Sequence, residues 1–336
     1  MRIGIDAIGS DHAPEAEVQG ALMARPLLDG GDRIVLIGPE PLLRDKLRDC
    51  GVPDWADWIE IHHAGQVIAM DDSPVEALRS KPDSSIARMA ELHRDGAVDA
   101  CISAGNTGAC VAAAQMRLRR LANVHRPGIA IIMPTFHGPV ALCDVGANVA
   151  CKPQHLHQYA VMSSVYARTT CGIASPRVGL LSVGEEEGKG NDLIKRTHEL
   201  LTEDKVGVNF IGNVEGRDLF NGTCDVMVCD GFVGNVIIKL VEGMAEGVVR
   251  GMATEMAAEL PPELAPQAKK AAKAIMGKYD YNEYGGAPLL GVDGICIICH
   301  GASNARGIMN TVRVAKAFST TGVNEQITNL LAGESR

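Results

Sequence analysis

The chain has 336 residues, of which 46% are hydrophobic and 22% charged, as is typical of a globular protein with a large core. Aromatic residues make up only 4% and the formal net charge is −9, which disfavours a base-stacking surface and a general polyanion binder. No apolar run approaches the roughly 20 residues of a membrane span, and no signal-peptide pattern is present. Together with ten cysteines, this predicts a cytoplasmic protein with reduced thiols that binds no nucleic acid.

Predicted strands and helices alternate through the first third of the chain. We predict strands over 2–7, 33–38, 59–63 and 98–102, and helices over 14–28, 40–50, 81–94 and 107–121. Asp6, Asp11 and His12 follow the first strand, and open α/β sheets bind ligands beyond the carboxyl ends of their strands. We therefore expect at least one of these three residues in a site. The alternative is that Asp11 caps a helix and His12 is an ordinary loop residue.

The segment 102–109, Ile-Ser-Ala-Gly-Asn-Thr-Gly-Ala, joins a buried strand to a helix. Free backbone N–H groups at the positive end of a helix dipole suit an anion such as phosphate. Glycine lets the backbone approach a ligand closely. The candidate phosphate-binding residues are Ser103, Gly105, Asn106, Thr107 and Gly108. The alternative is an ordinary turn in which Asn106 or Thr107 caps the helix.

Similar polar loops follow later strands. A strand over 140–144 ends in Asp144, with Asn148 and Lys152 before the next helix, and a lysine there is a natural counter-charge for phosphate. Strands over 177–183, 225–230 and 294–300 lead to further polar residues, which are Lys189, Asn191, Asp230, Asn235 and His300. The recurrence predicts one shared site. It also predicts a mostly parallel sheet with helices on both faces.

A helical hairpin is predicted over 239–278. Its first arm, 239–260, carries apolar residues at helical spacing, which indicate core or dimer packing. Its tip, 260–266, is rich in leucine and proline and could contact a partner or a membrane. Its second arm, 267–277, presents Lys269, Lys270 and Lys273, which form a basic surface.

Several well-known signatures are absent. The sequence has no nucleophile elbow, Walker lysine loop, zinc signature or dinucleotide fingerprint. The segment from Cys296 to His300 matches a haem-attachment string, but it forms an apolar strand in a chain without an export signal. We therefore expect no cofactor and no metal, and an α/β enzyme with an anion site.

The loops closely resemble those of the PlsX-type phosphate acyltransferases of bacterial phospholipid synthesis. The matching segments are DAIGSDHAP at 6–14, ISAGNTGA at 102–109, DVGAN at 144–148, GKGN at 188–191, GNVE at 212–215, DGFVGN at 230–235, YGGA at 284–287 and HG at 300–301. Ile8, Ser10 and Ala302 depart from the usual residues. The resemblance implies one α/β catalytic domain over 1–336, a three-layer Rossmann-like sandwich similar to isopropylmalate dehydrogenase and phosphotransacetylase, with a protruding hairpin.

The resemblance also implies the reaction, in which acyl carrier protein thioester and inorganic phosphate give acyl phosphate and free carrier protein. It implies a homodimer at the inner face of the membrane and a membrane glycerol-3-phosphate acyltransferase that takes the product. The basic arm would bind the acidic carrier protein. Candidate catalytic residues are Asp6, His12, Asn106, Asp144, Asn148, Lys152, Lys189, Asn191, Asp230, Asn235 and His300. A phosphotransacetylase using acyl-coenzyme A, a nicotinamide dehydrogenase and a non-catalytic membrane scaffold are the alternatives.

Overall fold

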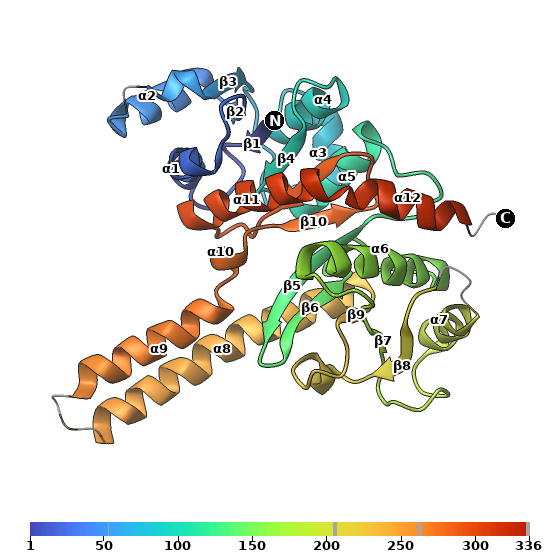
Figure 1. Cartoon of the computed structure of the whole chain (residues 1–336). Coiled ribbons are helices and arrows are strands. Elements are labelled where there is room, and N and C mark those ends of the chain that lie inside the picture. Colours follow the sequence, from blue (N-terminus) through green and yellow to red (C-terminus); the bar gives the residue numbers. More distant parts are fainter. Residues whose placement is uncertain (53, 204–206, 260, 262–263, 334–336) are drawn as a thin grey trace.

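In the computed structural model, which describes residues 1–336 except 53, 204–206, 260, 262–263 and 334–336, eleven strands form one sheet (Figure 1). Their spatial order is β3-β2-β1-β4-β11-β10-β5-β6-β9-β7-β8. The strands are β1 (Arg2–Asp6), β2 (Arg33–Gly38), β3 (Ile59–His63), β4 (Ala100–Ser103), β5 (Gly128–Thr135), β6 (Gly138–Cys143), β7 (Val178–Leu181), β8 (Phe210–Val214), β9 (Val226–Val228), β10 (Ala287–Leu290) and β11 (Ile295–Ile298).

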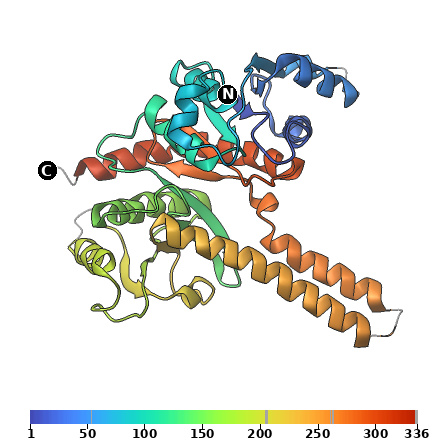
Figure 2. The same ribbon diagram turned by 180° about the vertical axis from the view of Figure 1, so that it is seen from behind.

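Helices cover both faces of the sheet, and two of them project from it (Figures 1 and 2). The α-helices are α1 (Glu15–Met23), α2 (Glu40–Asp49), α3 (Pro74–Ser80), α4 (Ser85–Arg94), α5 (Thr107–Arg117), α6 (Pro153–Cys171), α7 (Asp192–Thr202), α8 (Gly231–Glu259), α9 (Ala265–Tyr279), α10 (Tyr281–Tyr284), α11 (Ala305–Thr321) and α12 (Val323–Gly333). Short 3₁₀ helices span Arg25–Leu27, Trp55–Asp57 and Gly216–Leu219.

The predicted α/β class with a mostly parallel sheet is confirmed. Strands β1 to β4 and β11 pair in parallel in the first half of the sheet, and β6 to β9 pair in parallel in the second. Antiparallel β10 and β5 join the halves. The consecutive residues Leu36 and Ile37 of β2 point to opposite faces and are both completely buried, because a strand covered on both faces must be apolar on both.

The sheet opens where its halves meet. Strand β10 pairs with β5 through Leu289–Ile129 and Leu290–Gly128 alone, whereas β5 pairs with β6 as far as Thr135. The beginning of β10 and the end of β5 are therefore not joined by a ladder. This opening lies beside the carboxyl end of β4, since Ser103 pairs with Ile298 of β11.

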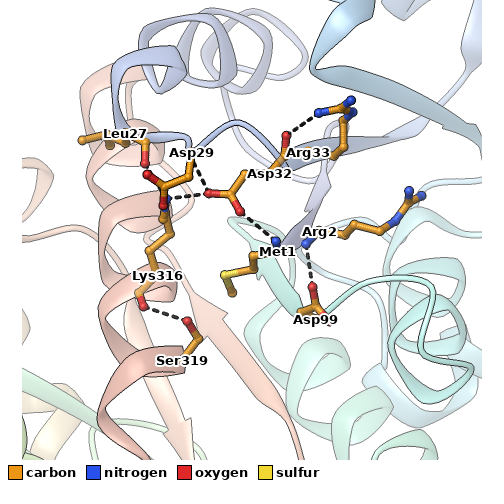
Figure 3. A network of polar contacts seen from close by, with 9 residues as sticks. All are labelled: Met1, Arg2, Leu27, Asp29, Asp32, Arg33, Asp99, Lys316 and Ser319. Atoms are coloured by element: carbon orange, nitrogen blue, oxygen red, sulfur yellow. Dashed lines mark hydrogen bonds and ion pairs between the residues drawn. The ribbon is translucent and has the colours of Figure 1, made fainter.

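Lys316 of α11 ties that helix to the amino terminus (Figure 3). The Met1 ammonium lies 2.7 Å from Asp32 Oδ1, and Lys316 Nζ lies 2.5 Å from Asp32 Oδ2 and 2.7 Å from Asp29 Oδ2. Burial would raise the pKa of Asp32, but the two cations outweigh it and hold that pKa well below its usual range. The ion pairs fix α11 against the first half of the sheet.

Helices α8 and α9 form the predicted hairpin, but α8 begins at Gly231 instead of 239, because Asp230 caps it. The expected single apolar stripe divides in two. Val249 and Ala268 are buried between the helices, whereas a row on α8 is exposed to solvent. That row comprises Val236, Leu240, Met244, Val248, Met252 and Met256.

Other differences from the predicted elements are local. The segment 284–291, expected to be a glycine-rich loop, contains β10 in the centre of the sheet, and helix α12 was not predicted. Helix α5 ends at Arg117, not 121. The predicted hairpin tip includes 260, 262 and 263, which lie outside the described residues. Across the described part of the chain, no helix is both long and apolar enough to cross a bilayer.

Candidate active site

The first loop of the site is organised by Asp6 at the end of β1. Ser103 Oγ donates a hydrogen bond to Asp6 Oδ2 over 2.7 Å and accepts one from the Gly105 N–H over 3.0 Å. Gly9 packs against Asp6 and Gly105, because a Cβ at Gly9 would lie 2.3 Å from Asp6 Oδ2 and 2.9 Å from Gly105 Cα. Asp6 is completely buried, which raises its pKa. Asp6 therefore acts as a buried support for this loop.

Asn106 caps helix α5. Its side-chain oxygen accepts from the Ala109 N–H over 2.9 Å, and its Nδ2 lies 3.1 Å from each of the carbonyl oxygens of Ala69, Met70 and Asp72. The amide thereby fastens the segment before α3 to the beginning of α5. The Thr107 and Gly108 N–H groups belong to the first helical turn, where the helix supplies no acceptor. Of the two predicted caps, Asn106 is the one used.

The second loop is organised by Asp144 at the end of β6. Its carboxylate accepts four backbone hydrogen bonds of 2.7–3.1 Å, from Ile129, Gly146, Ala147 and Asn148. The Asn148 side chain donates to Pro127 O over 2.6 Å and to Tyr159 Oη over 2.8 Å. Burial raises the pKa of Asp144, while these N–H donors oppose the rise. The two side chains brace the loop.

Helix α8 begins directly against this second loop. A Cβ at Gly234 would lie 2.0 Å from the Asp144 carbonyl oxygen, and one at Gly231 would lie 2.7 Å from the Asn148 carbonyl oxygen. Asp230 Oδ1 accepts from the Phe232 and Val233 N–H groups, both over 3.0 Å. Glycine is therefore required for close packing here, and Asp230 acts as the helix cap.

Both loops meet at one cavity of about 930 Å³. Gly105 and Thr107 line it from the first loop and the start of α5, Gly146 lines it from the second loop, and Asn235 lines it from α8. His300, after β11, completes the polar lining. Because α8 begins at the second loop and its residues line the same cavity as the start of α5, the two halves of the site share one space.

Lys239 also lines the cavity, although sequence reasoning placed it only at the start of the hairpin. Its Nζ contacts His300 Nε2 and lies 3.0 Å from Glu242 Oε2. His300 Nδ1 accepts from the Ala302 N–H over 3.1 Å, so a neutral ring carries its proton on Nε2. Neither this N–H nor the Lys239 ammonium can accept from the other, so the two groups need an acceptor such as a bound anion between them. Burial and the Lys239 charge lower the pKa of His300 and favour that neutral ring. Two donors thus face the same space.

Apolar residues form most of the remaining cavity wall. Cys299 lies in this wall, and burial raises its pKa to about 12, so its thiol is not a ready nucleophile. All ten cysteines are free; seven are buried and three are half-buried. In the part of the chain that the structure describes, no group of three or more histidine, cysteine or acidic side chains could hold a metal ion.

The other predicted site residues lie behind or outside the cavity. Asp6, Ser103, Asn106, Asp144, Asn148 and Asp230 hold its loops, as described above. Lys152 stands at the N-cap position of α6 without a side-chain cap hydrogen bond, and the Asn191 side chain caps α7; both residues are exposed. His12 and Lys189 are also exposed and do not line the cavity. Lys269, Lys270 and Lys273 are exposed on α9. Their expected roles stay predictions.

The family model described as "fatty acid synthesis protein" matches residues 1–326. A phosphate acyltransferase of Acidobacterium capsulatum is 47% identical over 97% of this chain and 95% of its own length. One of Trichlorobacter lovleyi is 44% identical over 99% and 95%. A phosphotransacetylase structure from Streptococcus pyogenes superposes with a TM-score of 0.60, covering 95% and 94% at 16% identity, which supports the fold alone. The resemblance inferred from the loops is confirmed, and the chain belongs to the fatty acid synthesis protein family, together with these phosphate acyltransferases.

Proposed function

We propose that this protein transfers the acyl group of an acyl carrier protein thioester to inorganic phosphate, and so makes acyl phosphate for phospholipid synthesis. One observation supports this above the others: a single cavity joins the amino terminus of α5 to Lys239 and His300. An anion-binding helix terminus and a pair of donors are what an oxyanion reaction requires.

Phosphate would bind at the first turn of α5. The Thr107 and Gly108 N–H groups lie at the positive end of the helix, and Gly105 is needed for packing because a Cβ there would lie 3.0 Å from Asp6 Oδ2. Lys239 would supply the counter-charge, exchanging its exposed pair with Glu242 for phosphate. Asp6 and Asn106 would act as positioning residues, because their hydrogen bonds hold this turn.

The thioester carbonyl would bind beside His300 and Asn235. A phosphate oxygen forms a bond to the carbonyl carbon, and negative charge develops on the carbonyl oxygen, where the His300 Nε2–H can stabilise it. When this intermediate collapses, the C–S bond breaks and the thiolate leaves. A thiol with a pKa of about 8.5 needs little help from a general acid. The product is an acyl phosphate, and the proton that hydrogenphosphate loses is balanced, through water, by the proton that the thiolate takes up.

The test is to incubate the purified full chain with phosphate and a long-chain acyl carrier protein, and to trap acyl phosphate as a hydroxamate with hydroxylamine. A parallel reaction contains acyl-coenzyme A, which the phosphotransacetylase alternative prefers. Product from the carrier thioester alone supports the proposal. A larger yield from the coenzyme A thioester would favour the alternative, and no product from either would favour a non-catalytic scaffold.

Lys239→Ala tests the phosphate site directly. We expect kcat/KM for phosphate to fall about 100-fold, because one preorganised charged donor is lost. Lys195→Ala on α7 is the matched control, since that lysine is exposed and lies outside the cavity. Equal kinetics for the two variants would remove Lys239 from the mechanism.

We further propose a homodimer that packs the exposed apolar row of α8 against a second copy. Leu240, Met244 and Val248 are each more than half exposed. Beside them Gly243, Gly247 and Gly251 leave open space for a close neighbour. Glutamate at Met244 and Val248 should convert a dimer to a monomer in light scattering, whereas glutamate at the exposed Thr254 should not. A wild-type monomer would contradict this.

The basic arm of α9 would bind the carrier protein, which is acidic. Reversing Lys269, Lys270 and Lys273 to glutamate should raise the KM for the carrier substrate and leave kcat unchanged. An unchanged KM would indicate that the basic arm is an ordinary solvated surface that does not bind the carrier protein. The proposed setting is the cytoplasm at the inner face of the membrane, where a membrane glycerol-3-phosphate acyltransferase would consume the amphipathic product.

A further inference from the structure

The cavity of about 930 Å³ reaches both faces of the sheet. On one face its lining comes from α8, with Ile238, Lys239 and Val241. On the other face it comes from α6 and α11, which include Tyr166 and Phe318. Helices α6 and α11 lie toward the viewer in Figure 1, whereas α8 lies toward the viewer in Figure 2. The cavity therefore passes through the sheet.

The passage follows the opening between β5 and β10. Ile131 and Met133 belong to the core on the α8 face, whereas Ile132 packs with the core on the α6 face, as alternation along a strand requires. All three line the cavity, and so do Gly286 and Ala287 at the beginning of β10. No backbone ladder closes this gap, since β10 and β5 pair only at Leu289 and Leu290.

The two ends of the cavity differ in chemistry. The end near α5 holds Lys239 and His300, which carry the proposed reaction. The other end holds Tyr166 and Phe318, whose rings are 6.4 Å apart, together with Ala317. Tyr166 and Phe318 are buried, at 4% and 7% exposure, whereas Ala317 is exposed at the mouth. Three threonines of α6 and α11 and Arg313 also line this second end. An occupant would therefore be anionic or polar at the reacting end and apolar where it passes through the sheet.

We propose that this passage is the acyl-chain channel of the enzyme, and that Ala317 and Phe318 limit the length of chain it accepts. The proposal rests on the proposed function, because the reacting carbonyl would place the chain at the channel entrance. A linear chain attached there can leave the polar site through the opening beside Ile131 and end between α6 and α11. The channel would thus select long unbranched acyl groups.

The test compares Ala317→Phe with wild type over carrier thioesters from butyryl to stearoyl. Burying one methylene contributes about 0.8 kcal/mol, so each methylene kept out should lower kcat/KM roughly fourfold. We expect butyryl transfer within about twofold of wild type and palmitoyl transfer at least tenfold slower. Phe318→Ala should shift the preference toward longer chains. Thr320→Phe is the matched control, because Thr320 is exposed on α11 and does not line the cavity.

The channel proposal would be wrong if Ala317→Phe left the dependence of kcat/KM on acyl-chain length unchanged, or if it lowered kcat/KM equally at every length. Binding of a fluorescent long-chain fatty acid is measured in parallel, because it does not depend on turnover. Weaker binding in Ala317→Phe without any acyl phosphate from wild type would support the channel and contradict the proposed function. Normal acyl phosphate formation by wild type, with unchanged probe binding and an unchanged length profile in Ala317→Phe, would support the proposed function and contradict the channel.

Discussion

The two halves of the molecule bury carboxylates in contrasting ways. In the second half, Asp144 is completely buried and accepts four backbone hydrogen bonds. In the first half, Glu17 of α1 is also completely buried, but neither of its carboxylate oxygens has a hydrogen-bond partner among the described residues. Asp6 is intermediate, with Ser103 as its side-chain donor.

The contrast shows what each carboxylate contributes. Backbone N–H donors compensate the desolvation of Asp144 and simultaneously fix the loop that lines the cavity, so this residue organises the site. Glu17 has no set of backbone donors of this kind, and although the nearby Ser10 hydroxyl opposes the rise, burial raises the pKa of Glu17 to about 7. The nearby Asp6 charge acts in the same direction. Of these two completely buried acids, Asp144 therefore organises a loop, whereas Glu17 costs stability.

Asp144→Asn should produce the largest effect. An amide at this position aims an N–H₂ group at N–H donors, so we expect the free energy of unfolding to fall by about 4 kcal/mol and activity by more than 100-fold. Urea unfolding and hydroxamate formation measure the two effects. Asp230→Asn is the matched control for stability, because asparagine caps a helix as well as aspartate does. Equal losses of stability in both would mean that Asp144 does not organise its loop.

Glu17→Leu should act in the opposite direction. The unfolded carboxyl titrates near 4.5 and the folded one at about 7, so protonation favours the folded state between these values. Stability should therefore fall as pH rises from 4.5 to 7 and level off above it, by about 3 kcal/mol in wild type. The Glu17→Leu variant should lack this pH-dependent fall in stability and should be more stable than wild type at pH 8. Parallel stability–pH profiles for the two proteins would show that Glu17 is solvated.

Sequence reasoning predicted one shared pocket because polar loops recur at strand ends. Gly105, Thr107, Asn235 and His300 were all predicted, and the structure brings them to one cavity. Residue type alone could not separate the residues that line the cavity from those that support it. Asp144 and Asn148 look like catalytic groups in the sequence, but their polar atoms are occupied by the backbone and by Tyr159.

The misplaced elements share a physical cause. The segment from Gly231 to Asn235 reads as a loop because it holds two glycines, but glycine is required where α8 touches the Asp144 loop. Lys239 was therefore placed at a helix start and not beside His300. Strand β10 was missed since only four residues separate its flanking glycines, and its burial comes from neighbours far along the chain.

Ser103→Ala should have a smaller effect within the first half. It removes the donor to Asp6 and the acceptor for the Gly105 N–H, and leaves a buried carboxylate with fewer partners. We expect a loss of about 2 kcal/mol in stability and a several-fold rise in the KM for phosphate, with kcat nearly unchanged. Ser103→Thr keeps the hydroxyl and serves as the control. A normal KM in Ser103→Ala would separate the Asp6 network from phosphate binding.

Lys189→Ala should have the smallest effect, and it tests whether a third loop takes part. Lys189 lies in the loop before α7, whose backbone is held by the Asn213 Nδ2 donation to Glu186 O over 2.9 Å. This loop does not line the cavity. We therefore expect less than about a twofold change in kcat/KM for phosphate, as for other exposed charges away from a reacting centre. A tenfold loss would require the loop to close onto the cavity during turnover, because only a group that reaches the bound phosphate could stabilise its charge to that extent.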